Sequence, residues 1–262
     1  MTMRRLGFAY NPTNEAAVEL RERAAGWAGV RHLEHWAAPS GDFEALVREL
    51  PTTDVLVVLG GDGTFLRAAR AVAQVDVPLL GVNLGKVGFL SKVEAGELEA
   101  VLGQLVAGEY RIDERMTLEA QILPTGQAGT GFVHFALNDT SHLASFIADG
   151  LVVASPTGST GYSFSAGGPI VEPLGRNLVV TPIAGYLSAI RSVVVGPNQT
   201  IRCRIVDAHE ALVSVDGRED LPIAVGDVVE VRAVERPIRL VEPRSAKPFW
   251  DLVRHKVELL PS

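Results

Sequence analysis

Val55-Leu-Val-Val-Leu-Gly-Gly-Asp-Gly-Thr64 joins a continuous apolar run to a loop that has three glycines in four positions. Unbroken apolar runs are typical of strands that are buried on both faces of a parallel sheet. The stretch that follows, Phe65–Arg70, predicts a helix, so the segment is interpreted as strand, tight turn and helix. Ligands of such sheets bind at the carboxyl ends of strands, where helix N-termini suit phosphate. We therefore expect a phosphate-binding loop here, with the Asp62 carboxylate inside it.

Strand and helix signals alternate over residues 1–110. Apolar runs predict strands at 6–10, 55–59 and 77–82, and helical spacing is found at 15–27, 42–50, 64–73 and 94–106. Such alternation is typical of a doubly wound parallel sheet with helices on its faces. An N-terminal α/β domain is therefore expected.

Short apolar runs separated by turn residues replace this alternation after residue 110. They lie at 118–123, 131–137, 151–154, 178–182, 202–206, 211–215, 228–234 and 238–241. Their density predicts a C-terminal β-sandwich-like domain, which makes the whole fold α/β plus β. The tail 249–257 has helical spacing, and we expect this helix to pack back on the first domain. The expected domains are residues 1–110 joined by 245–262, and residues 111–244.

Composition narrows the classes of partner. The net charge of −7 argues against nucleic acid as the main partner. No apolar run reaches the roughly 18 residues of a membrane span, and the N-terminus does not resemble a signal peptide, so no membrane partner is expected. Cys203 is the only cysteine, which excludes internal disulfides and favours a reducing, cytoplasmic setting.

The first loop has a structural alternative. A tight strand-to-helix turn with Asp62 near the helix N-cap would use the same residues. Arg67 and Arg70 follow on the helix, where they suit either phosphate or ordinary solvated positions.

A second glycine-rich segment, residues 82–90, superficially resembles a P-loop. Lys86 comes one residue too early, however, and Val87 stands where the P-loop requires Ser or Thr. The segment is therefore not a P-loop, and it either borders a ligand or forms a plain surface turn.

Polar residues gather in two later segments. Asn138-Asp139 can bond ribose hydroxyls, although this pair on its own is more typical of a turn. Residues 149–169 are dense in glycine and small hydroxyls, which suits a polar ligand better than a linker, because apolar strands flank the segment.

The histidines are scattered, and His32 and His35 lack a third ligand nearby, so no metal site is expected from them.

Together these segments resemble the NAD kinase family, whose members depend on ATP or polyphosphate. The matching motifs are Gly60-Gly-Asp-Gly-Thr64, Leu137-Asn-Asp139, Asp149-Gly150 with Ser155–Pro169, Val215-Asp-Gly-Arg218, and Phe249-Trp-Asp-Leu-Val-Arg-His-Lys256. The resemblance covers essentially the whole chain. The first motif is shared with lipid kinases, whereas the segment 155–169 is the specific one.

The resemblance implies an enzyme that transfers a phosphoryl group from ATP, another triphosphate or polyphosphate to the 2′-hydroxyl of the adenosine ribose of NAD, giving NADP. It implies that Asp62 accepts the proton of that hydroxyl, and that Mg²⁺ accompanies the donor phosphates without a metal ligand being assigned in the chain. Gly60, Gly61 and Thr64 would form the phosphate loop. The implied substrate-binding residues are Asp62, Gly63, Arg67, Asn138, Asp139, Asp149, Thr160, Gly161, Tyr162, Ser163, Phe164, Ser165, Ala184 and Arg218.

The resemblance also implies that residues 111–244 bind NAD and that the protein is a homodimer or homotetramer. The chain departs from the family pattern at Ile147, Gly161, Gly185-Tyr186 and Arg218, which leaves the finer ligand contacts open. Two other functions are compatible with parts of the pattern. A lipid kinase would share the glycine-aspartate loop, and a non-catalytic NAD(P) sensor would share the binding segments but would not need Asp62.

Overall fold

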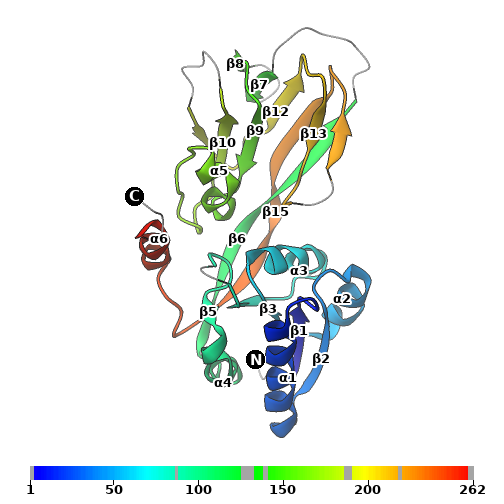
Figure 1. Cartoon of the computed structure of the whole chain (residues 1–262), viewed down its shortest axis with the longest axis vertical. Coiled ribbons are helices and arrows are strands. Elements are labelled where there is room, and N and C mark those ends of the chain that lie inside the picture. The colour runs from blue at the N-terminus through cyan, green and yellow to red at the C-terminus, as the bar shows by residue number, and fades with distance from the viewer. Residues whose placement is uncertain are drawn as a thin grey trace. The chain divides into compact units, whose positions relative to one another are not determined.

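The computed structural model describes residues 3–85, 88–124, 133–137, 141–185, 191–217 and 220–258, with only the backbone at 133–137, 141–146 and 256–258. The chain forms two compact units, Met1–Arg115 with Ile238–Ser262, and Met116–Pro237 (Figure 1). The first is an α/β unit and the second is mostly β, so the expected α/β plus β fold is confirmed. The C-terminal segment Ile238–Ser262 belongs to the first unit.

The first unit is built on a parallel sheet. Its strands are β1 (Arg5–Tyr10), β2 (Glu34–Pro39), β3 (Val55–Leu59) and β4 (Leu79–Asn83), in the order β2-β1-β3-β4. The short β5 (Val93–Glu94) pairs with β4, and the end of β15 (Val228–Pro243) joins β4 through Leu240 and Leu79. The order reverses direction beside β1, which is the doubly wound arrangement that the alternation predicts.

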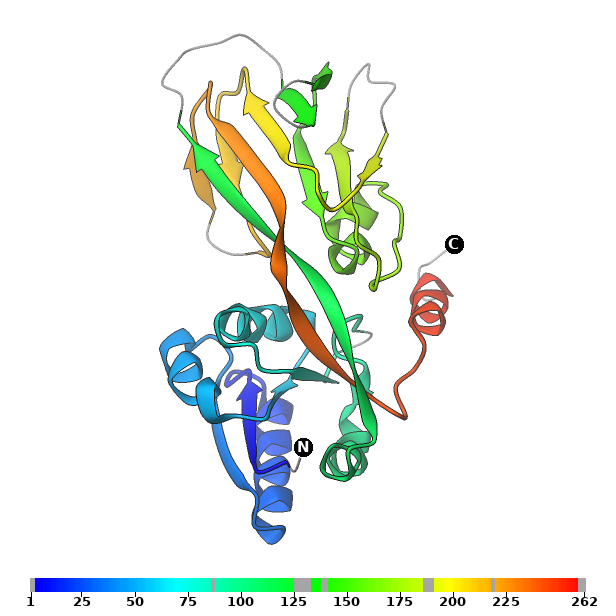
Figure 2. The ribbon, with the colours of Figure 1, turned by 180° about the vertical axis from the view of Figure 1, so that it is seen from behind.

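Helices cover both faces of this sheet (Figure 2). They are α1 (Glu15–Val30), α2 (Phe43–Glu49), α3 (Asp62–Val75) and α4 (Leu98–Ala107). The unit also contains the terminal α6 (Phe249–Glu258) and the short 3-10 turns η1 (Leu50–Thr52) and η2 (Ala95–Glu97). Side chains of β3 alternate between two cores, because Val55, Val57 and Leu59 pack with α1 and α4 while Leu56 and Val58 pack with α2 and α3. A strand buried on both faces therefore explains the continuous apolar run.

The second unit consists of antiparallel strands. They are β6 (Tyr110–Leu123), which begins in the first unit, β7 (Val133–Leu137), β8 (Ser141–Phe146), β9 (Gly150–Ala154), β10 (Leu178–Ile183), β11 (Val193–Val195), β12 (Ile201–Ile205), β13 (Ala211–Val213), β14 (Leu221–Ile223) and the first part of β15. They pair as β15-β12-β7-β8, β11-β10-β9 and β13-β14. The 3-10 turn η3 (Thr157–Thr160) and the short α5 (Tyr162–Ser165) lie between β9 and β10.

Candidate functional site

The loop after β3 depends on Gly60, where the structure has no room for a side chain. A Cβ at this position would lie 2.5 Å from Thr64 Oγ1 and 2.7 Å from Thr64 Cβ, and Thr64 is itself buried. A Cβ at Gly61 or Gly63 would meet no atom of the described chain within 4 Å. The loop is therefore closed at Gly60 and open at the other two glycines, beside the first turn of α3. Backbone N–H groups of a first helical turn have no partner within the helix and suit phosphate oxygens.

Asp62 is the first residue of α3, and its carboxylate is held by a second loop. Oδ2 accepts a hydrogen bond from Phe89 N at 3.0 Å. Oδ1 accepts from Leu90 N at 3.1 Å and from Ser91 N at 3.4 Å. The N-cap of the helix is Gly61, so Asp62 stands next to the N-cap, as the structural alternative also requires, but no side chain caps this helix end. The Asp62 side chain instead joins two loops that the sequence separates by 27 residues.

The second loop approaches Asp62 closely because glycines line both sides of the contact. A Cβ at Gly88 would lie 3.0 Å from Asp62 Oδ1 and 2.8 Å from Ser91 O. A Cβ at Gly81, on β4, would lie 2.7 Å from Leu90 O. This part of segment 82–90 is therefore part of the Asp62 site, whereas Lys86 and Val87 lie outside the described residues. The glycines after β4 were the only sequence signal for it.

The two arginines of α3 differ in their surroundings. Arg67 is exposed and donates to Thr64 Oγ1 at 3.3 Å and to Ser40 Oγ at 3.4 Å, so it borders the glycine loop. The Arg70 guanidinium lies 4.7 Å from the centre of the Phe43 ring, on α2. Both side chains are exposed, and they differ in that Arg67 borders the glycine loop whereas Arg70 lies over the aromatic ring of the neighbouring helix.

A buried ion cluster lies at the far end of the second loop. We use this name for Lys92, Asp113, Arg115 and Glu242. Lys92 Nζ lies 2.7 Å from Glu242 Oε1, and Arg115 Nη2 lies 3.4 Å from the same oxygen and 3.3 Å from Asp113 Oδ2. Burial lowers the pKa of Arg115, although a guanidinium stays charged in proteins. Sequence reasoning missed this cluster, since its members come from distant segments without a shared motif.

In the second unit, several hydroxyls of segment 149–169 serve the fold. Ser159 Oγ donates to Pro156 O at 2.7 Å and accepts from Val171 N at 2.9 Å. Ser163 Oγ lies 3.2 Å from Thr181 Oγ1, and a Cβ at Gly168 would lie 2.6 Å from each of these oxygens. Thr160 is buried as well, and its hydroxyl donates to Thr157 O at 3.3 Å. These residues therefore shape the segment rather than present their hydroxyls to solvent.

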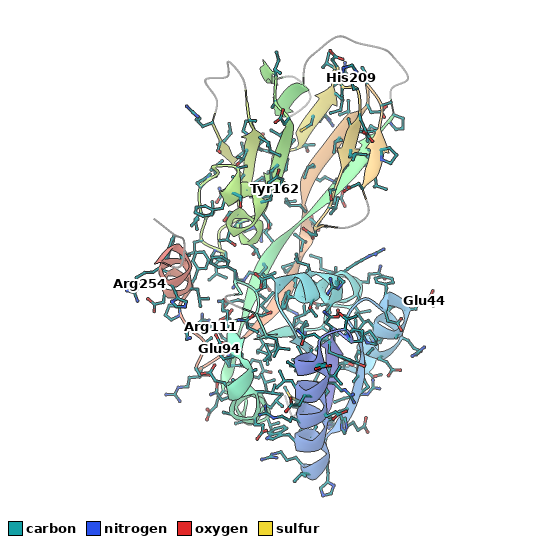
Figure 3. The ribbon with its side chains drawn as sticks, viewed as in Figure 1. Glu44, Glu94, Arg111, Tyr162, His209 and Arg254 are labelled. Atoms are coloured by element: carbon teal, nitrogen blue, oxygen red, sulfur yellow. The ribbon has the colours of Figure 1, made fainter. Side chains whose placement is uncertain are left out.

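Other residues of this segment face outward. Tyr162, labelled in Figure 3, is 64% exposed and Phe164 is 39% exposed, and Gly161 and Ser165 are exposed too. Asp149 and Ala184 are exposed at the end of the β9–β10 pair, where Asp149 N donates to Ile183 O at 3.0 Å. Ala184 has a φ of 49°, which non-glycine residues seldom adopt.

The structure thus groups the expected site residues in two sets. Gly60, Gly61, Asp62, Gly63, Thr64 and Arg67 lie together in the first unit, and Asp149, Thr160, Gly161, Tyr162, Ser163, Phe164, Ser165 and Ala184 lie in the second. Asn138, Asp139, Tyr186 and Arg218 lie outside the described residues.

Within the described ranges, no group of three His, Cys, Asp or Glu side chains is arranged to hold a metal ion. None of the helices described is long and apolar enough to cross a membrane.

Comparison with known families finds matches along most of the chain. The model of the ATP-NAD kinase N-terminal domain matches residues 7–110, and that of the ATP-NAD kinase C-terminal domain matches residues 124–243. A NAD kinase of Heliobacterium modesticaldum is 36% identical over 97% of this chain and 98% of its own length. A NAD kinase of Symbiobacterium thermophilum is 40% identical over 92% of this chain and 88% of its own length.

Two solved structures resemble the chain over nearly its full length. Yeast NADH kinase complexed with NADH superimposes with a TM-score of 0.78 at 25% identity, covering 99% of this chain and 88% of that one. A NAD kinase from Archaeoglobus fulgidus in complex with ATP gives a TM-score of 0.76 at 25% identity, covering 98% of this chain and all of that one.

Proposed function

The chain belongs to the NAD kinase family, and on that premise we propose that Asp62 is the base that accepts the 2′-hydroxyl proton of NAD. The enzyme phosphorylates NAD to NADP with ATP as phosphoryl donor. The observation that carries the role of Asp62 is its carboxylate, fixed by the N–H groups of Phe89, Leu90 and Ser91 beside the open turn of α3.

The hydrogen bonds of Asp62 leave capacity for a hydroxyl. A carboxylate has about four acceptor directions, and the described residues occupy two at Oδ1 and one at Oδ2. A substrate hydroxyl could donate a hydrogen bond to the unoccupied lone pair of Oδ2. It would then be oriented by a carboxylate whose rotation the three N–H groups restrain. Such a positioned base typically contributes about 10²–10⁴-fold to a rate.

The proposed reaction is a direct transfer. The 2′-oxygen of the ribose forms a bond to the γ-phosphorus while the bond from that phosphorus to the bridging oxygen breaks and ADP leaves. Asp62 takes the hydroxyl proton as the new bond forms. The helix N-terminus and the open positions at Gly61 and Gly63 support a role for this loop in orienting phosphates.

Mg²⁺ is proposed to enter with the donor phosphates. Mg²⁺ usually keeps several waters and binds through one or two carboxylates together with substrate phosphates. When bound, the ion would neutralise charge on those phosphates.

The second unit is proposed to bind NAD. Its exposed aromatic rings, Tyr162 and Phe164, suit stacking on a base, and Asp149 beside Ala184 offers an acceptor for hydroxyl or amide groups. Asn138, Asp139 and Arg218 keep the binding roles predicted from the sequence. Use of polyphosphate as the donor, cytoplasmic location and a homodimeric or homotetrameric state also stay predictions. Light scattering of the purified protein measures the last of these.

The test of the base is Asp62→Asn, assayed for NADP formation from NAD, ATP and Mg²⁺. We expect kcat to fall by about 10²-fold or more, with circular dichroism unchanged. Asp42→Asn is the matched control, because Asp42 caps α2 through Ala45 N at 3.0 Å and asparagine caps helices equally well. Turnover in Asp62→Asn that equals the control would remove Asp62 from this role.

A further inference from the structure

We infer that Lys92 and Glu242 are positioning residues, whose buried ion pair holds the 89–91 turn against Asp62. This inference rests on the proposed role of Asp62 as the base. Neither residue is proposed to contact a ligand. Each acts through the backbone amides that orient the Asp62 carboxylate.

The link from Asp62 to the ion pair is short. Ser91 N donates to Asp62 Oδ1, and Lys92 is the next residue along the chain. Lys92 Nζ lies 2.7 Å from Glu242 Oε1, and the two side chains are only 8% and 3% exposed. Solvent screening is therefore weak, and the pair fixes the end of the turn at one place.

The partner of Lys92 stands on a rigid element. Glu242 lies two residues after Leu240, which pairs with Leu79 of β4. Arg115 also bonds the same Glu242 oxygen, so the carboxylate is held from a second side. On the other side of Lys92, Val93 pairs with Val82 of β4. The turn that carries the three amides is thus anchored to the sheet immediately after Ser91.

The buried ion cluster is poorly explained by stability alone. Glu242 Oε2 and Arg115 Nε are buried, and neither finds a hydrogen-bond partner among the residues described. A buried charged network with unsatisfied atoms is often no more stable than an apolar replacement of similar volume. The Lys92–Glu242 pair does give Lys92 a defined position. Lys92 directly follows Ser91, whose N–H group donates to Asp62.

The experiment compares Lys92→Met with Lys92→Arg in the full-length protein. Methionine keeps the length of the side chain, and Glu242 keeps its contact with Arg115. Circular dichroism checks that the variant is folded. Because small displacements of catalytic groups cost up to about 10²-fold in rate, we expect Lys92→Met to lower kcat by about 10-fold or more. The KM values for NAD and ATP should stay within about 2-fold. Lys92→Arg restores the pair and should recover most of kcat.

Hydrogen exchange supplies a readout that does not depend on turnover. Peptides that contain Phe89, Leu90 and Ser91 should exchange faster in Lys92→Met than in the wild type, and Lys92→Arg should restore slow exchange. Arg23→Met is the control, because Arg23 forms an exposed pair with Glu99, 3.2 Å apart and away from this turn. We expect it to change neither kcat nor exchange at 89–91.

Two results would overturn the inference. If the rate of amide hydrogen exchange at residues 89–91 is unchanged in Lys92→Met, the Lys92–Glu242 pair does not hold the turn. Faster exchange with unchanged kcat shows that the turn does not orient the catalytic group. A failure of the proposed base is separate, since it appears as full turnover in Asp62→Asn, whatever the exchange of the three amides.

Discussion

Gly60 is the residue whose replacement the structure tolerates least in the glycine loop. We predict that Gly60→Ala lowers the free energy of unfolding by about 1–3 kcal/mol, the usual cost of overpacking, because its Cβ would overlap Thr64. Gly26→Ala on the exposed side of α1 meets no described atom within 4 Å and should stabilise by about 0.5–1 kcal/mol. Urea unfolding of both variants measures the difference. Equal stabilities would contradict the close contact at Gly60.

Cys203 on β12 gives a residue-scale prediction about pH. Burial raises the pKa of its thiol from 9.0 to about 12. The unfolded chain therefore loses this proton above pH 9 while the folded chain keeps it until about pH 12, so stability is complete below pH 9 and falls above it. We expect the wild type to lose about 1.4 kcal/mol per pH unit above pH 9 relative to Cys203→Ala.

Urea unfolding at pH 8, 9 and 10 checks this expectation for Cys203. The variant has no thiol at this position, so titrations elsewhere in the protein cancel in the difference between the two curves. Curves that stay parallel from pH 8 to pH 10 would show that the thiol ionises in the folded protein as easily as in the unfolded one.

Single residues differ in how far the sequence reveals them. Asp62 was predictable because glycines surround it directly after an apolar strand. Its hydrogen-bond donors at 89–91 were not, since backbone amides carry no side-chain signature and lie 27 or more residues away. Lys92 and Glu242, 150 residues apart, carry no pairing signal in one sequence.

At the scale of helices and strands, the predicted bounds agree with the observed ones where an element is buried along its whole length, and differ elsewhere. The strand at 55–59 and the helix after it are observed at nearly the expected bounds. The strand β2 was missed, because Glu34–Pro39 has no continuous apolar run and lacks β-branched residues. The runs 228–234 and 238–241 were expected as two strands and are one, β15, which continues through Pro237. The polar residues Glu235 and Arg236 break the apolar run but not the strand.

The helix α6 allows a prediction for one element. The ring of Phe249 lies 6.1 Å from that of Phe89, centre to centre, and Phe89 N is a donor to Asp62. We expect Phe249→Ala to lower the free energy of unfolding by at least the roughly 0.5–1.5 kcal/mol of an aromatic pair. Arg254→Ala, at an exposed position of the same helix, should stay within about 0.5 kcal/mol of the wild type. Equal effects would contradict docking of α6 through Phe249.

For the whole molecule, the sequence predicted the architecture of each unit, α/β and mostly β. It did not predict how all the strands pair. Alternating strands and helices required a parallel sheet with both faces covered, and the two cores on either side of β3 follow from this. The second unit was predictable as mostly β from its short apolar runs. Its pairing order was not, because antiparallel strands of similar composition can pair in several ways.

The proposed path of the metal gives a prediction for the whole enzyme. If Mg²⁺ arrives with ATP, EDTA should abolish NADP formation, and added Mg²⁺ should restore it. The melting temperature of the protein without nucleotide should not change with EDTA, because the ion is proposed to enter with the nucleotide. A resident ion that stabilised the fold would raise stability in proportion to its binding, so its removal would lower the melting temperature. Thermal unfolding with and without EDTA separates a metal carried by the substrate from one held by the protein.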